Sequence, residues 1–281
     1  MTMVSIKNLT YSFTKKTRLF DGLNLELATG SIYGLFGLNG AGKTTLLNHI
    51  AGMLFPKEGE CLVAGQLSRE RHPDTLSDIF LLPEQFECPP LTANEYSRVH
   101  APFYPRFDED YFRQAMNELL VEPDKLLTEL SYGQRKKFLI AFALATRARL
   151  LLMDEPTNGL DIPSKSQFRK IMAGSDHSDR CIVISTHQVR DLESMIDHLT
   201  VLNDGKIIFN QNIIAISDKL NFEKMDEDDN RYHLYSEETF GGKNAILPKK
   251  PDSKETQVDL ELLFNAVIQN PDLINRQFQG E

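Results

Sequence analysis

The sequence predicts an α/β fold in which a mostly parallel sheet is covered by helices on both faces. Short apolar segments of strand length alternate with stretches of helical periodicity between residues 31 and 209, the pattern of strands joined by crossover helices. One such segment, Ser31–Phe36, leads directly into a glycine-rich loop and then into a helical pattern of leucines and isoleucines. Hydrophobic residues make up 41% and charged residues 25% of the 281 positions, which is ordinary for a globular protein.

A smaller antiparallel sheet is expected near the N-terminus. Short segments with alternating apolar positions are separated there by polar stretches, which is typical of strands with one solvated face. We expect these strands at Val4–Leu9, Leu23–Leu27 and Glu60–Ala64. A further apolar segment, Asp78–Leu82, predicts a buried strand of the main sheet that ends at Pro83.

The region between Phe86 and Leu130 has a different character, with clustered prolines and helical patterns. Thr92, three residues before Glu95, is typical of a helix cap. Asp108–Val121 predicts an amphipathic helix. We therefore expect a helical subdomain, at about residues 86–130, inserted into the α/β core.

The α/β pattern resumes after this region and continues to about residue 215. We expect helices at Gln134–Arg147, Ser164–Met172 and Val189–Leu199, and strands at Leu150–Asp154, Cys181–Thr186, Thr200–Leu202 and Lys206–Phe209. Beyond that point the pattern weakens, with an exposed loop expected at Leu247–Asp252 and one last helix at Val258–Gln269. The chain is thus expected to divide into a domain at residues 1–215 and a C-terminal extension of unknown role at residues 216–281.

The glycine-rich loop Gly37–Thr44 reads G-x-x-x-x-G-K-T and has the strand–loop–helix context of a P-loop. A triphosphate needs backbone N–H groups within reach, and the three glycines keep side chains out of the way. The following helix adds donors and the positive end of its dipole. Lys43 is expected to reach the β- and γ-phosphates, and Thr44 to bind Mg²⁺. A plain turn is the alternative, but the flanking order favours a P-loop NTPase core.

Two carboxylates lie at the end of the predicted strand Leu150–Asp154, Asp154 as its last residue and Glu155 directly after it. This is the edge at which open α/β sheets bind ligands. Asp154 can hold Mg²⁺ there, and Glu155 can accept a proton from an attacking water. An acidic turn is the alternative, and the nearby P-loop makes it less favoured because phosphoryl transfer needs both charge neutralisation and a positioned nucleophile. Ser131 with Gln134 is typical of a capping box, which serves the helix whether or not an anion binds.

Charge and cysteine content exclude some classes of function. The net charge of −9 argues against a nucleic-acid-binding surface as the main function. The three cysteines are far apart and form no CxxC pair, so a metal or disulfide framework is not expected and a reducing cytoplasm fits. The sequence contains neither a signal-peptide pattern nor an apolar run of the roughly 20 residues that cross a bilayer. We expect another chain to supply any membrane part.

The motifs and their order along the chain resemble those of the ATP-binding subunit of an ABC transporter, over roughly residues 4–215. The matches are Walker A at Gly37–Thr44, the Q-loop glutamine at Gln85, the signature LSGGQ at Leu130–Gln134, Walker B at Leu150–Asp154, the D-loop at Gly159–Asp161 and the switch histidine at His187. Six motifs in the order of the family are far more specific than any one alone.

The resemblance implies that two such domains pack head to tail with ATP between them. On one side ATP would be held by Gly37, Asn39, Gly40, Ala41, Gly42, Lys43, Thr44 and Thr45. On the other side the second subunit would contribute Ser131, Gly133 and Gln134. ATP would then close the dimer, and hydrolysis would let it open.

The resemblance also implies roles in hydrolysis. Glu155 would act as general base and His187 would contact the γ-phosphate. Gln85 would touch Mg²⁺ and sense the partner, and Asp161 would link the two sites. The expected ligands of Mg²⁺ are Thr44, Gln85 and Asp154. Without the order of motifs, His187 would be interpreted as a solvated histidine, Gln85 as a surface glutamine and Asp161 as a helix cap.

Family members place an aromatic residue near the N-terminus on the adenine ring. Spacing to Lys43 favours Phe13, with Tyr11 as the alternative, and core packing at a strand end is the other interpretation of either ring. Tyr132 departs from the family, because it occupies a signature position usually held by glycine. Its side chain either points away from the close contact expected there or alters the interface.

The expected partners are membrane-spanning transporter subunits and a second nucleotide-binding subunit, identical or different, on the cytoplasmic, inner face of the cell membrane; no nucleic acid is expected. The helical region would meet the membrane chains and resembles that of export-type subunits. Its candidate contacts, also explained by core packing, are Phe86, Phe103, Tyr104 and Tyr111. The alternatives are a soluble ABC-type ATPase of translation, repair or cofactor assembly, and a P-loop kinase or switch GTPase. A single nucleotide-binding unit without long coiled-coil or zinc insertions favours transport.

Overall fold

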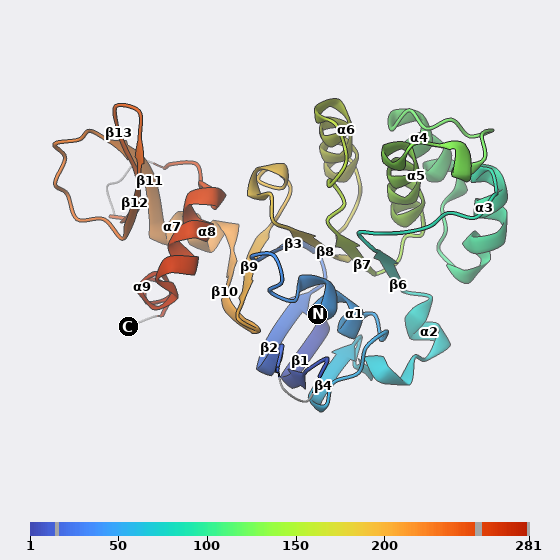
Figure 1. Ribbon diagram of the computed structural model, residues 1–281, viewed down its shortest axis with the longest axis horizontal. Helices are drawn as coiled ribbons and strands as arrows, with labels where there is room; N and C mark the ends of the chain where they lie inside the picture. The colour runs from blue at the N-terminus through green and yellow to red at the C-terminus, as the bar shows by residue number, and fades with distance from the viewer. Residues whose placement is uncertain (15–16, 251–254, 280–281) are drawn as a thin grey trace.

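The computed structural model describes residues 1–14, 17–250 and 255–279, and a six-stranded sheet lies at its centre (Figure 1). The strand order is β10-β9-β3-β8-β7-β6. All neighbours are parallel except β10, which pairs antiparallel with β9. The bounds are β3 Ser31–Phe36, β6 Ile79–Leu82, β7 Leu150–Asp154, β8 Cys181–Thr186, β9 His198–Asn203 and β10 Lys206–Asn212. The predicted mostly parallel sheet is confirmed.

Both faces of the central sheet are buried, and successive residues of a strand belong to opposite cores. In β7, Leu151 and Met153 pack in the larger core, against helices, whereas Leu150 and Leu152 pack in the core beneath the N-terminal sheet. This alternation follows from the two-residue period of a strand. It explains why the strands read as continuous apolar runs in the sequence.

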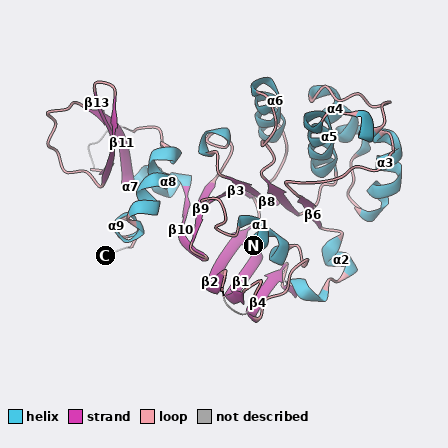
Figure 2. Cartoon of the chain, viewed as in Figure 1, coloured by secondary structure: helices cyan, strands magenta, loops and turns pink. Residues whose placement is uncertain are grey.

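The N-terminal part forms the predicted antiparallel sheet, in the order β2-β1-β4-β5 (Figure 2). Its strands are β1 Thr2–Tyr11, β2 Phe20–Ala28, β4 Glu58–Val63 and β5 Gln66–Leu67. Helix α1 (Lys43–Ile50) shares a core with this sheet through Leu46 and Leu47. Two short helices, η1 (Ser68–Glu70) and α2 (Pro73–Leu76), then lead to β6.

The predicted helical region is present beside the edge strand β6. It consists of α3 Ala93–His100, η2 Ala101–Phe103, α4 Glu109–Glu118 and η3 Leu127–Glu129, followed by α5 Tyr132–Ala145. The predicted cap on Thr92 forms a reciprocal capping box with Glu95. Phe112 of α4 packs against Phe138 and Phe142 of α5, with ring centroids 6.2 and 6.0 Å apart. Within the described residues, no helix has both the length and the apolar content to span a membrane.

The predicted helix Val189–Leu199 is wrong. After α6 (Ile162–Ala173) and β8, only a single 3-10 turn, η4 (Val189–Asp191), forms in this segment. Strand pairing explains the difference, because β9 begins at His198, which pairs with Tyr33 of β3. The Asp197 side chain accepts the N–H of Ile32 at 2.8 Å and so anchors the start of that strand.

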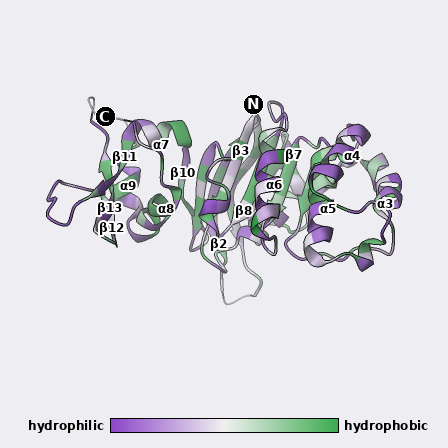
Figure 3. Ribbon diagram, turned by 90° about the horizontal axis from the view of Figure 1, so that it is seen from above, coloured by the Kyte–Doolittle hydropathy of each residue, from purple (hydrophilic) through white to green (hydrophobic). Residues whose placement is uncertain are grey.

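The C-terminal region is more regular than the sequence predicts. It contains α7 Ile213–Lys219, the antiparallel strands β11 Leu220–Met225, β12 Tyr235–Thr239 and β13 Gly242–Pro248, and the helices α8 Leu260–Gln269 and α9 Pro271–Asn275. The last predicted helix is confirmed in α8. The prediction of an exposed loop at 247–252 is wrong at Leu247, which is buried in β13. Residues 251 and 252 of this prediction lie outside the described residues. In Figure 3 the loop between β11 and β12 is mostly hydrophilic.

The C-terminal helices share the larger core of the α/β domain. Leu263 of α8 is fully buried in that core, and Phe264 packs on Phe36 of β3 with ring centroids 6.3 Å apart. Asn275 of α9 donates to the carbonyl of Ile208 in β10 at 2.8 Å. The C-terminal helices therefore pack directly on the central sheet, and α9 reaches its edge strand β10.

We predict that Leu263→Ala lowers the free energy of unfolding of the whole chain by about 2–5 kcal/mol, since it opens a cavity in the shared core. Urea unfolding followed by circular dichroism measures this. Ile214→Ala, at a position 71% exposed, is the control and should change the free energy by less than about 0.5 kcal/mol. A separate early transition, with the main transition unmoved, would contradict a shared core.

Candidate functional site

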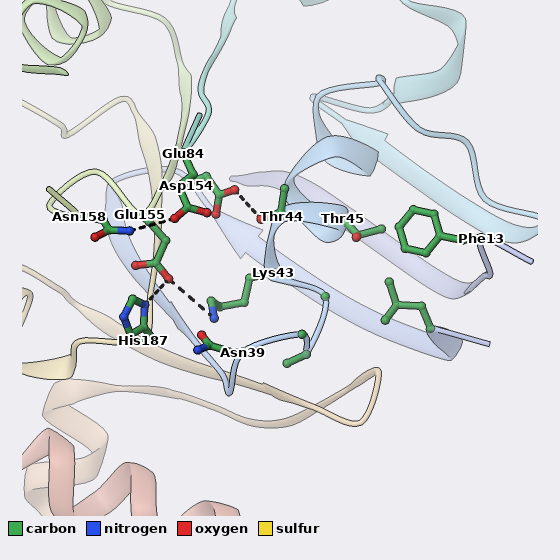
Figure 4. Close-up of a pocket in the computed structure, with 14 residues that line it drawn as sticks. Phe13, Asn39, Lys43, Thr44, Thr45, Glu84, Asp154, Glu155, Asn158 and His187 are labelled. Atoms are coloured by element: carbon green, nitrogen blue, oxygen red, sulfur yellow. Dashed lines mark hydrogen bonds and ion pairs between the residues drawn. The ribbon is translucent and has the colours of Figure 1, made fainter. Parts of the chain in front are cut away.

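A cavity of about 550 Å³ opens at the carboxyl ends of the central strands, a size typical of small-molecule sites. Figure 4 shows its residues converging from the β3–α1 loop, the end of β7 and the end of β8. The lining residues are Phe13, Leu19, Asn39, Gly40, Ala41, Gly42, Lys43, Thr44, Thr45, Glu84, Asp154, Glu155, Asn158 and His187. Most of the residues predicted to hold one side of ATP thus meet in one place.

The glycine-rich loop reaches the cavity because its glycines allow unusual backbone paths. Gly42 is the N-cap of α1 and has φ +106°, in the left-handed region that side chains disfavour. Gly37 stands at the start of the loop, directly after β3. It does not line the cavity, and a Cβ there would lie 2.4 Å from the carbonyl oxygen of Leu202. The bare backbone at Gly37 therefore permits close packing against β9.

Lys43 is buried at the base of the cavity. Its ammonium donates to the carbonyl of Gly37 at 2.8 Å and lies 3.8 Å from a carboxylate oxygen of Glu155. Burial lowers the pKa of Lys43, while Glu155, Asp154 and Glu84 act in the opposite direction. A bound polyphosphate would supply the negative charge that favours the protonated form of the amine.

Asp154 is held from two sides at the end of β7. The Thr44 hydroxyl donates to one carboxylate oxygen at 2.5 Å, and the Ser185 hydroxyl donates to the other. The carboxylate is buried, with 2% of the residue exposed. A hydroxyl and a carboxylate are the kinds of oxygen ligand that Mg²⁺ prefers, so the donor set fits this ion.

Glu155 points from the next residue into the same cavity. Its backbone has φ +47°, and its N–H donates to the carbonyl and the hydroxyl of Ser185, both at 3.1 Å. His187 Nδ1 lies 2.9 Å from Glu155 Oε1, and because a carboxylate oxygen accepts, the histidine N–H is the donor. Figure 4 shows Glu155 between Lys43 and His187. A carboxylate oriented in this way is suited to proton transfer.

The two candidate adenine contacts differ in position. Phe13 lines the cavity and is 67% exposed, as an aromatic platform for a ligand would be. Tyr11 does not line it and instead packs edge-on against the buried His49, with ring centroids 4.5 Å apart. This geometry favours Phe13.

Gln85 lies in the loop after β6 and lines a smaller adjoining cavity of about 230 Å³ with Thr44 and Asp154. The predicted ligands of Mg²⁺ therefore lie around one region. Glu84 and Asn158 also line the main cavity, and the Asn158 amide donates to Glu84 Oε1 at 2.9 Å. Neither is among the residues that the sequence predicts for the site, although Glu84 immediately precedes Gln85 and Asn158 immediately precedes the D-loop match Gly159–Asp161.

The signature residues lie outside the cavity. Ser131 is the N-cap of α5 and accepts the N–H of Gln134 at 3.3 Å. The reciprocal half of the predicted capping box does not form, since the buried Oε1 of Gln134 has no hydrogen-bond partner. Gly133 lies in the first turn of the same helix. Asp161 caps α6 by accepting the N–H of Ser164 at 2.9 Å. Hydrogen bonds from the Ser164 side chain and from this backbone N–H lower the pKa of Asp161.

The chain matches the family model described as "ABC transporter" over residues 20–158. It is 30% identical to the ABC transporter ATP-binding protein YtrB of Bacillus subtilis, over 73% of this chain and 70% of that protein. It is also 30% identical to the bacitracin transport ATP-binding protein BcrA of Bacillus licheniformis, over 74% of this chain and 69% of that protein. The chain belongs to the ABC transporter ATP-binding family.

This ABC protein is accordingly an ATP-binding protein and an ATPase. Its fold resembles that of the dimeric ATP-binding cassette MJ0796 bound to ADP and phosphate, with a TM-score of 0.65 and 24% identity over 75% of this chain and 98% of that one. The predicted P-loop NTPase core with an antiparallel sheet and inserted helices is confirmed.

We predict that Lys43→Met weakens ATP binding at least about tenfold, because it removes a charge-assisted contact from a buried position. Titration with ATP in a calorimeter measures the affinity. Lys125→Met is the matched control, since that lysine pairs with Glu122 at the surface, and its affinity should equal that of the unchanged chain. Equal affinities for all three proteins would contradict the assignment of this cavity to ATP.

Proposed function

We propose that this ATPase is the energy-supplying subunit of a membrane transporter and that it works as a dimer with ATP bound between two nucleotide-binding subunits. The observation that carries the proposal is the separation of the motifs in one chain. Lys43, Glu155 and His187 line the cavity, whereas Ser131 and Gly133 lie outside it at an accessible helix end. A second subunit is therefore needed to bring a signature helix to each cavity.

In this proposal the P-loop residues and Lys43 bind the phosphates, and Phe13 stacks on the adenine. Glu155 accepts the proton of the attacking water, and its hydrogen bond with His187 keeps the carboxylate directed into the cavity. Thr44, Asp154 and Gln85 would hold Mg²⁺, which would neutralise charge on the phosphates. Asp161, at the exposed start of α6, would connect the two sites across the interface.

We further propose that residues 1–215 form the ATP-binding domain, that residues 216–281 form an extension, and that the protein acts at the cytoplasmic face of the cell membrane. The helical region would contact the membrane-spanning chains. Of the four aromatic candidates, Phe103 is 69% exposed, whereas Phe86, Tyr104 and Tyr111 pack against the core. Val99 of α3, 54% exposed, extends the apolar surface of this region. Export is proposed on the resemblance of this region alone.

We predict that Glu155→Gln forms a dimer with ATP and Mg²⁺, since it binds ATP without hydrolysing it. Gel filtration with light scattering should show twice the monomer mass with ATP and the monomer mass with ADP. The double variant Lys43→Met/Glu155→Gln is the matched control and should remain monomeric. A Glu155→Gln chain that stays monomeric at saturating ATP would refute the ATP-bridged dimer.

We predict that Phe103→Ser reduces co-purification of the membrane-spanning chain at least about threefold, because an exposed aromatic anchor is lost from the interface. Affinity purification of the tagged chain from detergent-solubilised membranes, with quantitative mass spectrometry, measures this. Tyr232→Ser, at an equally exposed position in the C-terminal region, should leave the yield unchanged. Recovery of ribosomes or DNA in place of a membrane protein would favour the soluble alternative.

A further inference from the structure

Tyr132, the residue that departs from the family signature, is folded back onto its own chain. Its ring stacks on Phe86 with centroids 5.3 Å apart and an interplanar angle of 18°. Its hydroxyl donates to the carbonyl of Glu84 at 2.7 Å. A Cβ at Gly159 would lie 2.9 Å from the ring, so the ring packs directly on the bare backbone of the D-loop. Tyr132 thus touches both the segment after β6 and the segment after β7.

Lys136 lies one helical turn after Tyr132, on the same face of α5. Its ammonium donates to the carbonyls of Glu155 at 2.6 Å and Asn158 at 3.1 Å. It also lies 5.6 Å from the centre of the Tyr132 ring, within the range of a cation–π contact. The side chain is fully buried, and burial lowers its pKa to about 8.

These contacts converge on a backbone turn that needs support. Glu155 is a non-glycine residue at φ +47°, a conformation that persists only where surrounding contacts impose it. Lys136 binds the carbonyl of that residue, and Asn158, at the end of the same turn, is tied to Glu84. Tyr132 closes the ring of contacts by binding the carbonyl of Glu84.

We propose that Tyr132 and Lys136 are positioning residues that join the start of the signature helix to the turn carrying Glu155. The inference rests on the proposed function and deepens it. Ser131, which would hold the nucleotide of the second subunit, immediately precedes Tyr132. The contacts therefore hold two parts as one unit. One is the start of α5, which would bind the ATP of the other subunit, and the other is Glu155, which would act on the chain's own ATP. Neither positioning residue lines the ATP cavity.

The test uses Lys136→Met and Tyr132→Phe in the full-length chain. Lys136→Met should lower kcat for ATP hydrolysis at least about tenfold and leave KM within about twofold, because it misplaces the general base and not the P-loop. Tyr132→Phe keeps the ring and removes one hydrogen bond, so we expect kcat to fall about threefold. Lys125→Met and Tyr232→Phe, at exposed positions, are the matched controls and should retain the full rate.

A double variant separates positioning from a general loss of structure. If Lys136 acts through Glu155, adding Lys136→Met to Glu155→Gln should not lower the residual rate further. The same double variant should still dimerise with ATP. Unchanged kcat in both single variants, or fully additive losses in the double variant, would overturn the inference while the dimer of Glu155→Gln stands. Absence of that dimer would refute the proposed function itself.

Discussion

The parallel register of β3, β8 and β7 is the constraint on which the site depends. Phe36 at the end of β3 pairs with Thr186, and Asp154 at the end of β7 pairs with Ser185. The three strands therefore end at the same level, and the residues that follow them emerge side by side. Lys43 lies more than a hundred residues before both Glu155 and His187 in the sequence. The register of the three strands brings these residues to one cavity.

Electrostatics then determine what such a cavity accepts. Glu84, Asp154 and Glu155 line it together with Lys43 and His187, so carboxylates outnumber the permanent cation. A polyphosphate could not approach these carboxylates without a counter-charge. The backbone N–H groups of the loop and the N-terminus of α1 supply part of this positive charge. A divalent ion near Thr44 and Asp154 would supply the rest. The chemistry of the P-loop and that of the acidic strand end are thus complementary.

Local signals in the sequence were sufficient for the core elements and for most cavity residues. Contiguous motifs contain Lys43, Thr44, Asp154 and Glu155. The strands beside these motifs are short apolar runs that are recognised from the sequence alone. The segment 189–199 has helical periodicity, but it does not form a helix. Its end belongs to β9, which pairs with β3, and periodicity does not report such pairing. The C-terminal sheet was missed because charged residues such as Glu223 and Lys224 interrupt the apolar pattern of β11. The fit of Tyr132 against Phe86 and Gly159 is a long-range contact and has no local signal.

The position of His187 depends on more than the strand that precedes it. The turn that follows, η4, is held on one side by Asp191, which accepts hydrogen bonds from Thr157 and Lys165 at 2.8 and 2.7 Å. On the other side α8 packs on η4, and Arg190 pairs with Glu261 of that helix. The exposed Arg190–Glu261 pair contributes little energy by itself, so the buried apolar packing of α8 is the stronger restraint. Packing of α8 therefore supports the turn that follows His187.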